Sequence, residues 1–302
     1  MRFIFCSDYW NPLAPDSAYE DEVNAVQKLG LSYSLIDFEA LVEQGDAERS
    51  VRRVESANVE ETAVYRGWML KPQMYERLYH ALKEKGLALI NTPEAYKHCH
   101  YLPEVYPILA GFTPASTWLR TGPEVSMDEV MALLQPFGNK PMIVKDFVKS
   151  RKHEWHEACY IQSAANRVEV ERVVRRFMQL QGEELNEGLV FREFVEFEPL
   201  TTHPKSGLPL SREYRLFVLD GQIIFVTPYW EEGDYTTGEA PPLDPFREIA
   251  QKIKSRFCTM DVARKMDGTW TIVEPGDGQV AGLPAHADRE AFYRALANGL
   301  RQ

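Results

Sequence analysis

The sequence predicts an α/β domain followed by an α+β unit: a parallel sheet near the N-terminus, then a larger part built on antiparallel hairpins. Three observations support this fold class. Strand-like and helix-like segments alternate over residues 1–90, which is typical of a parallel sheet with helices on its faces. Asp-Gly pairs separate β-rich runs in the last third of the chain. The 302 residues, 44% of them hydrophobic, fit a globular protein of two or three structural units.

Helix-end signals and apolar runs define the elements of the first 90 residues. Pro72 stands near the start of one helix and Gly86 follows its end, as these residue types do at helix termini. Gly30 closes an earlier helix in the same way. We expect strands at 3–7, 31–38, 63–69 and 87–91, and helices at 19–29 and 72–85.

The middle of the chain mixes both element types. A Ser-Met-Asp-Glu capping box opens a helix at 126–134. Apolar residues at helical spacing predict another helix at 168–180. Apolar runs predict strands at 142–147 and 189–195.

Two hairpins dominate the last third. Asp220-Gly221 and Asp267-Gly268 each lie between β-rich runs, which predicts two-residue type I′ turns. Between the hairpins we expect Asp244 to cap a helix whose apolar face extends to Phe257. Residues 231–242 are expected to form an unstructured loop.

Composition limits the partners and the compartment. A net charge of −11 argues against non-specific nucleic-acid binding, although the basic stretch 145–152 leaves that alternative open. No run approaches the ~20 apolar residues of a membrane span, and the N-terminal residues do not resemble a secretory signal. We therefore expect a cytoplasmic protein without a membrane partner. The four scattered cysteines are expected to be buried free thiols.

The second hairpin predicts an opposed pair of acids. Counting outward from a two-residue turn at Asp267-Gly268 places Asp261 opposite Glu274. Directly opposed side chains share a face, with Cβ atoms ~4.5–5.5 Å apart, and like charges there destabilise the sheet. One acid could be protonated, a base such as Lys265 could bridge them, or a divalent cation could lie between them. A solvated strand end is a further possibility.

The same hairpin leads to two expectations about metal and stability. Asp277 follows Glu274 closely and adds a third carboxylate near a metal site. If repulsion between the opposed acids dominates, Asp261→Asn should be neutral or stabilise the metal-free protein by a few tenths to ~1 kcal/mol.

A lysine inside an apolar strand suggests a phosphate site. Lys145 lies within the strand predicted at 142–147, and lysine is rarely buried without a partner. Basic residues follow at 149–152, and a basic loop after a strand suits a polyphosphate. A solvated charged turn is the alternative. Glu213 and Arg215 lie two residues apart, so they share a strand face; they could pair with each other or point into a site.

These segments occur in an order that is similar to a known family. The chain runs through INTPEAYKHCHYLPEVYPILAGFTPAST, PMIVKDFVKS, GLVFREFVEFEP, EYRLFVLDG and MDVARKMDGTWTIVEPGDG. In order and spacing these segments resemble the ATP-grasp superfamily, in particular its R-two-K clade, and YRGWML at 65–70 is similar to that clade's N-terminal region. The resemblance covers nearly the whole chain. It implies a pre-ATP-grasp domain at 1–90, a small lobe at 91–190 and a large lobe at 191–302.

The resemblance also implies roles for individual residues. ATP would be held by two lysines, by the backbone of the hinge between the lobes and by an acid on the ribose: Lys97, Lys145, Glu193, Phe194, Val195, and Glu196 or Glu198. The cations that would hold the transferring phosphoryl group are Lys149, Arg151 and Arg215. The Mg²⁺ ligands would be Asp261, Glu274 and Asp277. The wall of the acceptor pocket would include Arg66 and Trp68.

Two departures from the family pattern affect the phosphate site. VKSRKHEW stands where a glycine-rich flap is usual, and a Glu-x-Asn metal motif becomes Glu274-Pro275-Gly276-Asp277. The implied function is a Mg²⁺-ATP-dependent ligase that activates a carboxylate as an acylphosphate for attack by an amine or other nucleophile. The alternatives are a kinase acting on a hydroxyl or nucleic-acid end, and a nucleotide-binding regulator without turnover. The substrate is expected to be a small molecule or a peptide.

Overall fold

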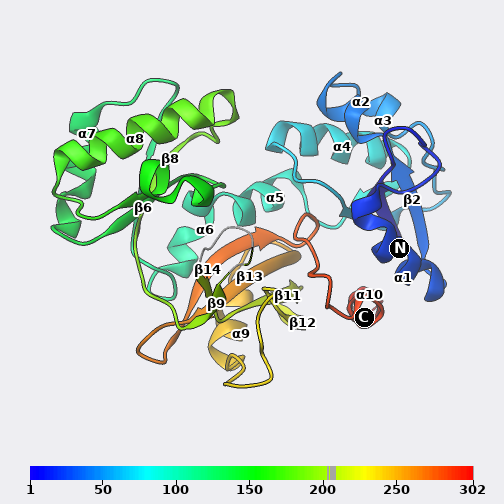
Figure 1. Ribbon diagram of the computed structural model, residues 1–302. Coiled ribbons are helices and arrows are strands. Elements are labelled where there is room, and N and C mark those ends of the chain that lie inside the picture. The colour runs from blue at the N-terminus through cyan, green and yellow to red at the C-terminus, as the bar shows by residue number, and fades with distance from the viewer. Residues whose placement is uncertain (203, 205–208, 302) are drawn as a thin grey trace.

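The computed structural model describes residues 1–202, 204 and 209–301. Three four-stranded sheets, each with its own helices, surround two central helices in this part of the chain (Figure 1). The predicted combination of a parallel N-terminal sheet with antiparallel sheets is confirmed. The division of the chain at residues 90 and 190 stays a prediction; the second boundary falls inside a strand. No helix of the described residues is long and apolar enough to cross a membrane.

The N-terminal sheet is parallel, with strand order β2-β1-β3-β4. Its strands are β1 (Arg2–Cys6), β2 (Ser32–Ile36), β3 (Glu61–Arg66) and β4 (Leu87–Leu89). Alternate residues of β1 enter different cores, because successive side chains point to opposite faces. One face packs on α2 (Phe38–Val42), α3 (Ala47–Ser50) and α4 (Pro72–Glu84); the other packs on α1 (Glu20–Lys28) and the C-terminal α10 (Arg289–Gly299).

The small lobe is an antiparallel sheet in the order β5-β8-β6-β7, covered by α7 (Met127–Leu134) and α8 (Arg167–Gln181). Its strands are β5 (Ser116–Arg120), β6 (Met142–Asp146), β7 (Tyr160–Ile161) and β8 (Gly188–Glu193). The segment between β6 and β7 has no extended flap. A short 3₁₀ turn and a π-helical turn, Trp155–Cys159, fill it instead.

The large lobe is an antiparallel sheet in the order β12-β11-β13-β14. Its strands are β11 (Glu213–Leu219), β12 (Gln222–Pro228), β13 (Phe257–Arg264) and β14 (Trp270–Asp277); a separate ribbon pairs β9 (Pro199–Thr202) with β10 (Pro209–Ser211). The predicted type I′ turn is confirmed, with positive φ at Asp220 and Gly221. The helix prediction was wrong at both ends: α9 (Asp244–Ala250) has no side-chain cap, and Phe257 opens β13.

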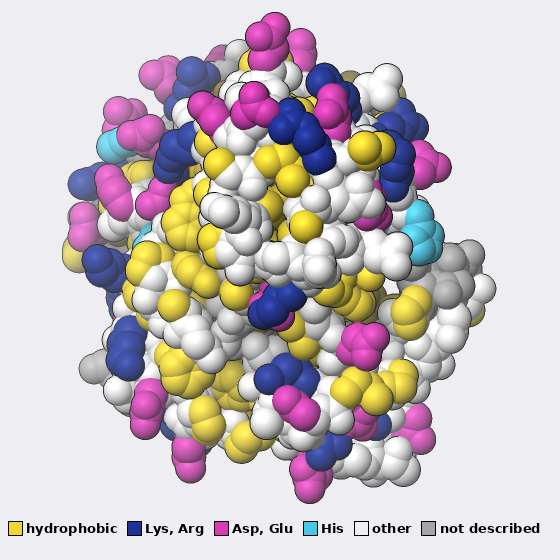
Figure 2. Space-filling view, turned by 90° about the vertical axis from the view of Figure 1, so that its left-hand side faces the viewer, with side chains coloured by type: hydrophobic (Ala, Val, Ile, Leu, Met, Phe, Trp, Pro, Cys, Tyr) yellow, Lys and Arg dark blue, Asp and Glu magenta, His cyan; other side chains and the backbone are white. Residues whose placement is uncertain are grey.

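The two faces of the large-lobe sheet differ in the helices that they contact and in their side chains. One face packs on α9 and on the two central helices, α5 (Pro93–His100) and α6 (Leu102–Leu109). The other face is apolar at one end, where Phe217 and Phe257 join the core under α10. At its other end the side chains are ionisable. From the small-lobe side, Figure 2 shows a hollow near the middle of the molecule with Lys or Arg side chains beside it.

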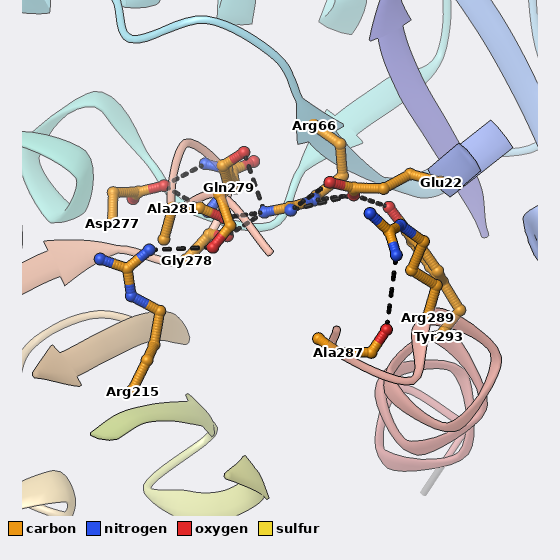
Figure 3. Close-up of polar contacts among 11 residues, drawn as sticks. Glu22, Arg66, Arg215, Asp277, Gly278, Gln279, Ala281, Ala287, Arg289 and Tyr293 are labelled. Atoms are coloured by element: carbon orange, nitrogen blue, oxygen red, sulfur yellow. Dashed lines mark hydrogen bonds and ion pairs between the residues drawn. The ribbon is translucent and has the colours of Figure 1, made fainter. Parts of the chain in front are cut away.

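A buried arginine joins the N-terminal domain to the loop that follows β14. Arg66, at the end of β3, donates hydrogen bonds to both oxygens of Glu22, at 3.0 and 3.1 Å. It also donates to the carbonyl oxygens of Gly278 (2.7 Å) and Ala281 (2.8 Å), as Figure 3 shows. Tyr293 of α10 donates to Glu22 as well. This network therefore ties four separate segments of the chain together: α1, the end of β3, the loop after β14 and α10.

Arg66→Met should destabilise the fold by about 3–5 kcal/mol, because it leaves Glu22 charged and unpaired in the interior. Urea denaturation of both proteins measures this. The control is Arg175→Met, which removes an exposed ion pair on α8 and should cost about 0–1 kcal/mol. Equal effects of the two substitutions would show that the Arg66 network does not hold the domains together.

Candidate functional site

The second large-lobe hairpin brings Asp261 and Glu274 together, although by a different route from the predicted one. The loop holds three residues, 266–268, because the Lys265 N–H pairs with the Thr269 carbonyl oxygen (2.8 Å). This shifts the pairing by one residue. A β-bulge next to Asp261 restores it and leaves Asp261 opposite Glu274. The predicted pair is confirmed, and the predicted two-residue turn is wrong.

Each of the two acids has its own basic partner. Arg215 of β11 donates from Nε and Nη2 to the two Asp261 oxygens, each at 2.8 Å. Lys145 of the small-lobe strand β6 lies 2.5 Å from Glu274 Oε1. Lys265, the predicted bridging base, pairs with Asp267 instead. The repulsion expected between Asp261 and Glu274 is therefore offset by the two cations that pair with them, Arg215 and Lys145.

Lys145 is buried, whereas the Glu274 side chain keeps 42% of its surface exposed. Burial alone would raise the pKa of Glu274, but Lys145 and Lys152 lower it to about 2. Glu274 is thus ionised at neutral pH and still reachable. A carboxylate in this state is a suitable ligand for a hard cation.

Glu213 belongs to the same cluster and was singled out in the sequence only as a neighbour of Arg215. It is buried on the same face of β11. Burial and the nearby Asp261 charge raise the pKa of Glu213 to about 7. The Lys152 side chain is exposed at the edge of the cluster; partial desolvation lowers its pKa, but the carboxylates of Glu274 and Glu213 outweigh this and raise that pKa overall. Lys152 therefore adds a third cation to the cluster.

Arg192 is a buried residue that sequence reasoning missed. It extends from β8 of the small lobe and donates to the carbonyl oxygens of Val273, at the bulge, and Ile272 (3.1 Å). It also donates to the Thr113 hydroxyl oxygen at 2.5 Å. Arg192 therefore holds the bulged part of β14 against the small lobe. The sequence feature that indicated Lys145, a basic residue inside an apolar run, also applies to Arg192, which lies in the run GLVFRE.

Asp146, also missed, shapes the basic loop after β6. Its Oδ1 accepts hydrogen bonds from the backbone N–H groups of Val148 (2.7 Å) and Lys149 (2.5 Å). The Lys149 side chain is exposed and has no ion-pair partner among the described residues. The Arg151 guanidinium instead donates to Gln181 Oε1 (3.0 Å) and to a backbone oxygen of α8. The predicted phosphate role thus fits Lys149, whereas Arg151 anchors the loop.

The hinge between the lobes keeps unused backbone groups. No hydrogen bond within the described part of the chain engages the N–H or C=O of Val195, or the N–H of Glu196. The N–H groups of Glu193 and Phe194 already donate to Ala115 and Pro141. Free donors and acceptors at a hinge can pair with the edge of a purine.

The structure also separates the two candidate ribose acids. Glu198 accepts hydrogen bonds from Arg212 Nε (3.1 Å) and Arg264 Nη1 (2.5 Å), so both of its oxygens are engaged. Glu196 is exposed, and no ion pair involves it among the described residues. Glu196 is therefore the acid left for a ligand.

Lys97 lies on α5, where its Nζ is 2.5 Å from Glu187 Oε1. Arg120 pairs with the same Glu187. The ammonium group also lies over the Tyr101 ring, 5.3 Å from its centroid. Lys97 keeps about a third of its surface exposed, so it can still reach a ligand.

Asp277 does not join Asp261 and Glu274, and the prediction of a three-carboxylate site needs correction. Asp277 lies opposite Cys258 in the strand register. Its side chain points to the other face of the sheet from those of Asp261 and Glu274, because side chains alternate along a strand. Its oxygens are fully buried and accept hydrogen bonds from Asn91 Nδ2 (2.6 Å) and the Gln279 N–H (2.9 Å). Within the described residues no group of three His, Cys, Asp or Glu could hold a metal ion.

The two candidate acceptor residues have different environments. Arg66 is buried in the domain junction and lines no open site, which corrects its predicted place in a pocket wall. Trp68 is 45% exposed and donates from Nε1 to Asp16 Oδ2 (2.9 Å). Trp68 is therefore still available to a ligand.

The architecture of three sheets with a charged face between two lobes is that of ATP-grasp proteins. The chain belongs to the ATP-grasp domain family, R2K clade family 3, whose model matches residues 136–296. No curated protein matches the sequence significantly.

Several solved structures share the fold at low sequence identity. D-cycloserine synthetase DcsG is 15% identical, with a TM-score of 0.58 over 99% of this chain and 100% of that one. The ATP-grasp ligase PsnB, complexed with minimal precursor, Mg and ADP, is 15% identical with a TM-score of 0.57 over 99% and 96%. D-alanine–D-alanine ligase from Bacillus anthracis, complexed with ATP, is 12% identical with a TM-score of 0.54 over 99% and 97%. These likenesses show the fold.

The contacts of Asp261 reverse the expected effect of neutralising it. In Asp261→Asn the partly buried Arg215 charge loses its ionised partner, so the ligand-free protein should lose up to about 3–5 kcal/mol of stability. Chemical denaturation checks this. The control is Asp220→Asn, which weakens a pair of the same bidentate geometry with Arg256 at the surface and should cost about 0–1 kcal/mol. A neutral or stabilising Asp261→Asn would restore the interpretation based on repulsion.

Proposed function

We propose that the protein is a Mg²⁺-ATP-dependent ligase that activates a carboxylate as an acylphosphate, which an amine or another nucleophile then attacks. The observation that carries this proposal is the presence of two ion pairs, side by side, at the junction of the two lobes. Lys145 and Glu274 come from different lobes, and Arg215 and Asp261 lie beside them. Membership of the ATP-grasp family supports the use of a nucleotide at this junction.

The residues present fit Mg²⁺-ATP. In the ligand-free protein Glu274 is paired with Lys145, and Asp261 with Arg215. When Mg²⁺-ATP binds, the phosphates would pair with the two bases and the cation would bind the two carboxylates. Glu274, ionised and partly exposed, suits Mg²⁺, and Asp261 lies directly opposite it. The free backbone groups of Val195 and Glu196 suit adenine. Mg²⁺, when bound, would neutralise charge on the phosphates.

The protein's own groups would position and stabilise the transferring phosphoryl group. Lys145 is held in one place by burial, so its ammonium can meet a phosphate with little reorganisation. Lys149 and Lys152 approach from the loop after β6, and Arg215 from the large lobe. A covalent cysteine intermediate is not supported: all four thiols are buried, and burial raises the pKa of each.

The acceptor is proposed to bind at the carboxyl ends of β1 and β3. In the strand order β2-β1-β3-β4, the chain leaves β1 towards β2 on one side and leaves β3 towards β4 on the other. Ligands of open α/β sheets bind at such a switch in strand order. Trp68 follows β3, and the exposed Trp10 follows β1. PsnB has been solved with a precursor peptide and DcsG is a D-cycloserine synthetase, so a peptide and a small molecule are both acceptor classes to test.

Mg²⁺-ATP at millimolar concentration should raise the melting temperature of the wild type by mass action. Lys145→Met should abolish this rise, because it removes the ammonium that meets the phosphates. The control is Lys140→Met, which removes an exposed lysine just before the same strand and should leave the rise intact. An unchanged wild-type melting temperature, or a normal rise in Lys145→Met, would contradict the proposed nucleotide site.

Hydroxylamine trapping should distinguish a ligase from a kinase. With Mg²⁺-ATP and a panel of carboxylates, a ligase should form a hydroxamate in step with ADP, because hydroxylamine attacks the acylphosphate. A kinase should instead give ADP and a stable phosphoester that hydroxylamine does not change. Mass spectrometry of the products decides between them.

A further inference from the structure

His100, the last residue of α5, is a buried imidazole whose hydrogen-bonding groups are unused. Its exposed fraction is 9%, and neither ring nitrogen has a hydrogen-bond partner within the described residues. Buried polar groups are nearly always paired in folded proteins, so an unpaired one calls for an explanation.

A stack of aromatic rings fixes the position of this imidazole. The Tyr75 and Tyr96 rings lie 4.0 Å apart and almost parallel, and the Tyr96 and His100 rings follow at 5.2 Å and 14°. The first two hydroxyls are both anchored, Tyr75 on the Asn91 carbonyl oxygen and Tyr96 on that of Leu70. The ring of His100 is therefore supported on one side by groups that cannot easily move.

The charged side chains that act on His100 are those of the proposed nucleotide site. Burial lowers the pKa of His100 to about 4; Glu274 opposes this shift, whereas Lys145 and Lys149 add to it. The ring is therefore neutral at physiological pH, with one N–H donor and one free acceptor. The helix that carries His100, α5, packs on β14. The start of α6, which follows directly, is bonded to the loop after β6, because the Leu102 N–H donates to the Phe147 carbonyl oxygen (3.0 Å).

We propose that His100 binds a phosphoryl oxygen of the bound nucleotide, donating a hydrogen bond from its neutral ring. This inference rests on the proposed function. An anionic oxygen is the partner that the position favours, because the charges of Lys145 and Lys149 act on the ring and a neutral imidazole can donate its N–H to an anion. The hydrogen bond would use a donor that the protein itself leaves unsatisfied.

His98 provides a matched comparison on the same helix. It lies two residues earlier, is about half-buried and also has an unpaired Nε2. Its charged neighbours, however, are Lys254 and Glu104, which do not belong to the proposed site. A general effect of removing a histidine from α5 should therefore appear in both variants.

The test measures the affinities of Mg²⁺-ADP and Mg²⁺-AMPPNP by calorimetry for the wild type, His100→Phe, His100→Gln and His98→Phe. His100→Phe keeps the ring stack and removes the donor, so we expect an unchanged or higher melting temperature without ligand. Loss of a hydrogen bond to a charged group should weaken nucleotide binding about 10- to 100-fold. His100→Gln restores an N–H donor and should recover part of the affinity. His98→Phe should bind like the wild type.

Each outcome decides one point. A loss confined to AMPPNP assigns the contact to the γ-phosphoryl group, and an equal loss for both ligands assigns it to the phosphates shared with ADP; either supports the proposal. Unchanged affinities in His100→Phe, or an equal loss in His98→Phe, would overturn it while the proposed function stands. If the wild type binds neither nucleotide, the proposed function fails and this inference fails with it.

Discussion

The ion pair between Lys145 and Glu274 is the contact on which the arrangement of the site depends. It joins a small-lobe strand to a large-lobe strand, and Arg192 crosses the same junction beside it. A lysine this buried requires a partner, and within the described part of the chain its ion-pair partner, Glu274, comes from the other lobe. The closed junction and the charge balance of the site are therefore consequences of the same pair.

The loop after β14 extends this dependence to the N-terminal domain. Arg66 donates to the carbonyl oxygens of Gly278 and Ala281 (Figure 3). Arg215 donates to the carbonyl oxygen of the next residue, Gly282 (2.9 Å). Arg215 is also the partner of Asp261. A ligand that drew Arg215 away from Asp261 would act on a residue that already contacts this loop. The loop is thus a physical connection between the proposed phosphate site and the proposed acceptor site.

Sequence reasoning succeeded where a local rule sets the outcome. Strand alternation, Asp-Gly turns and a lysine inside an apolar run were sufficient to predict the hairpins, the Asp261–Glu274 pair and the position of Lys145 inside a buried strand. The pair survived a wrong turn length because a bulge compensated for the shift, and no local signal predicts a bulge there. The register was correct for a reason that the sequence does not reveal.

Most of the failures have a different cause, since they depend on contacts with segments that are distant in the sequence. Arg66, Arg151 and Glu198 have ordinary residue types for a site, but each finds structural partners in another segment. Asp277 was misplaced because it lies three positions after Glu274, and an odd number of positions along a strand puts its side chain on the other face. For His100, only the fold shows that its ring nitrogens are buried without hydrogen-bond partners among the described residues.

The energetics of buried ion pairs explain why such a cluster points to function. Replacing a buried pair with apolar residues is often neutral or stabilising, so stability alone is a weak reason for two of them on one face of a sheet. Here Glu213, with its pKa raised to about 7, shares that face, whereas the other end of the same sheet packs through the apolar side chains of Phe217, Leu219 and Phe257. Strongly shifted carboxyl groups concentrate where charge must be bound or moved. The change from apolar to ionisable side chains along β11 and β13 therefore marks the limit between the part of the sheet that packs in the core and the part that we propose meets a charged ligand.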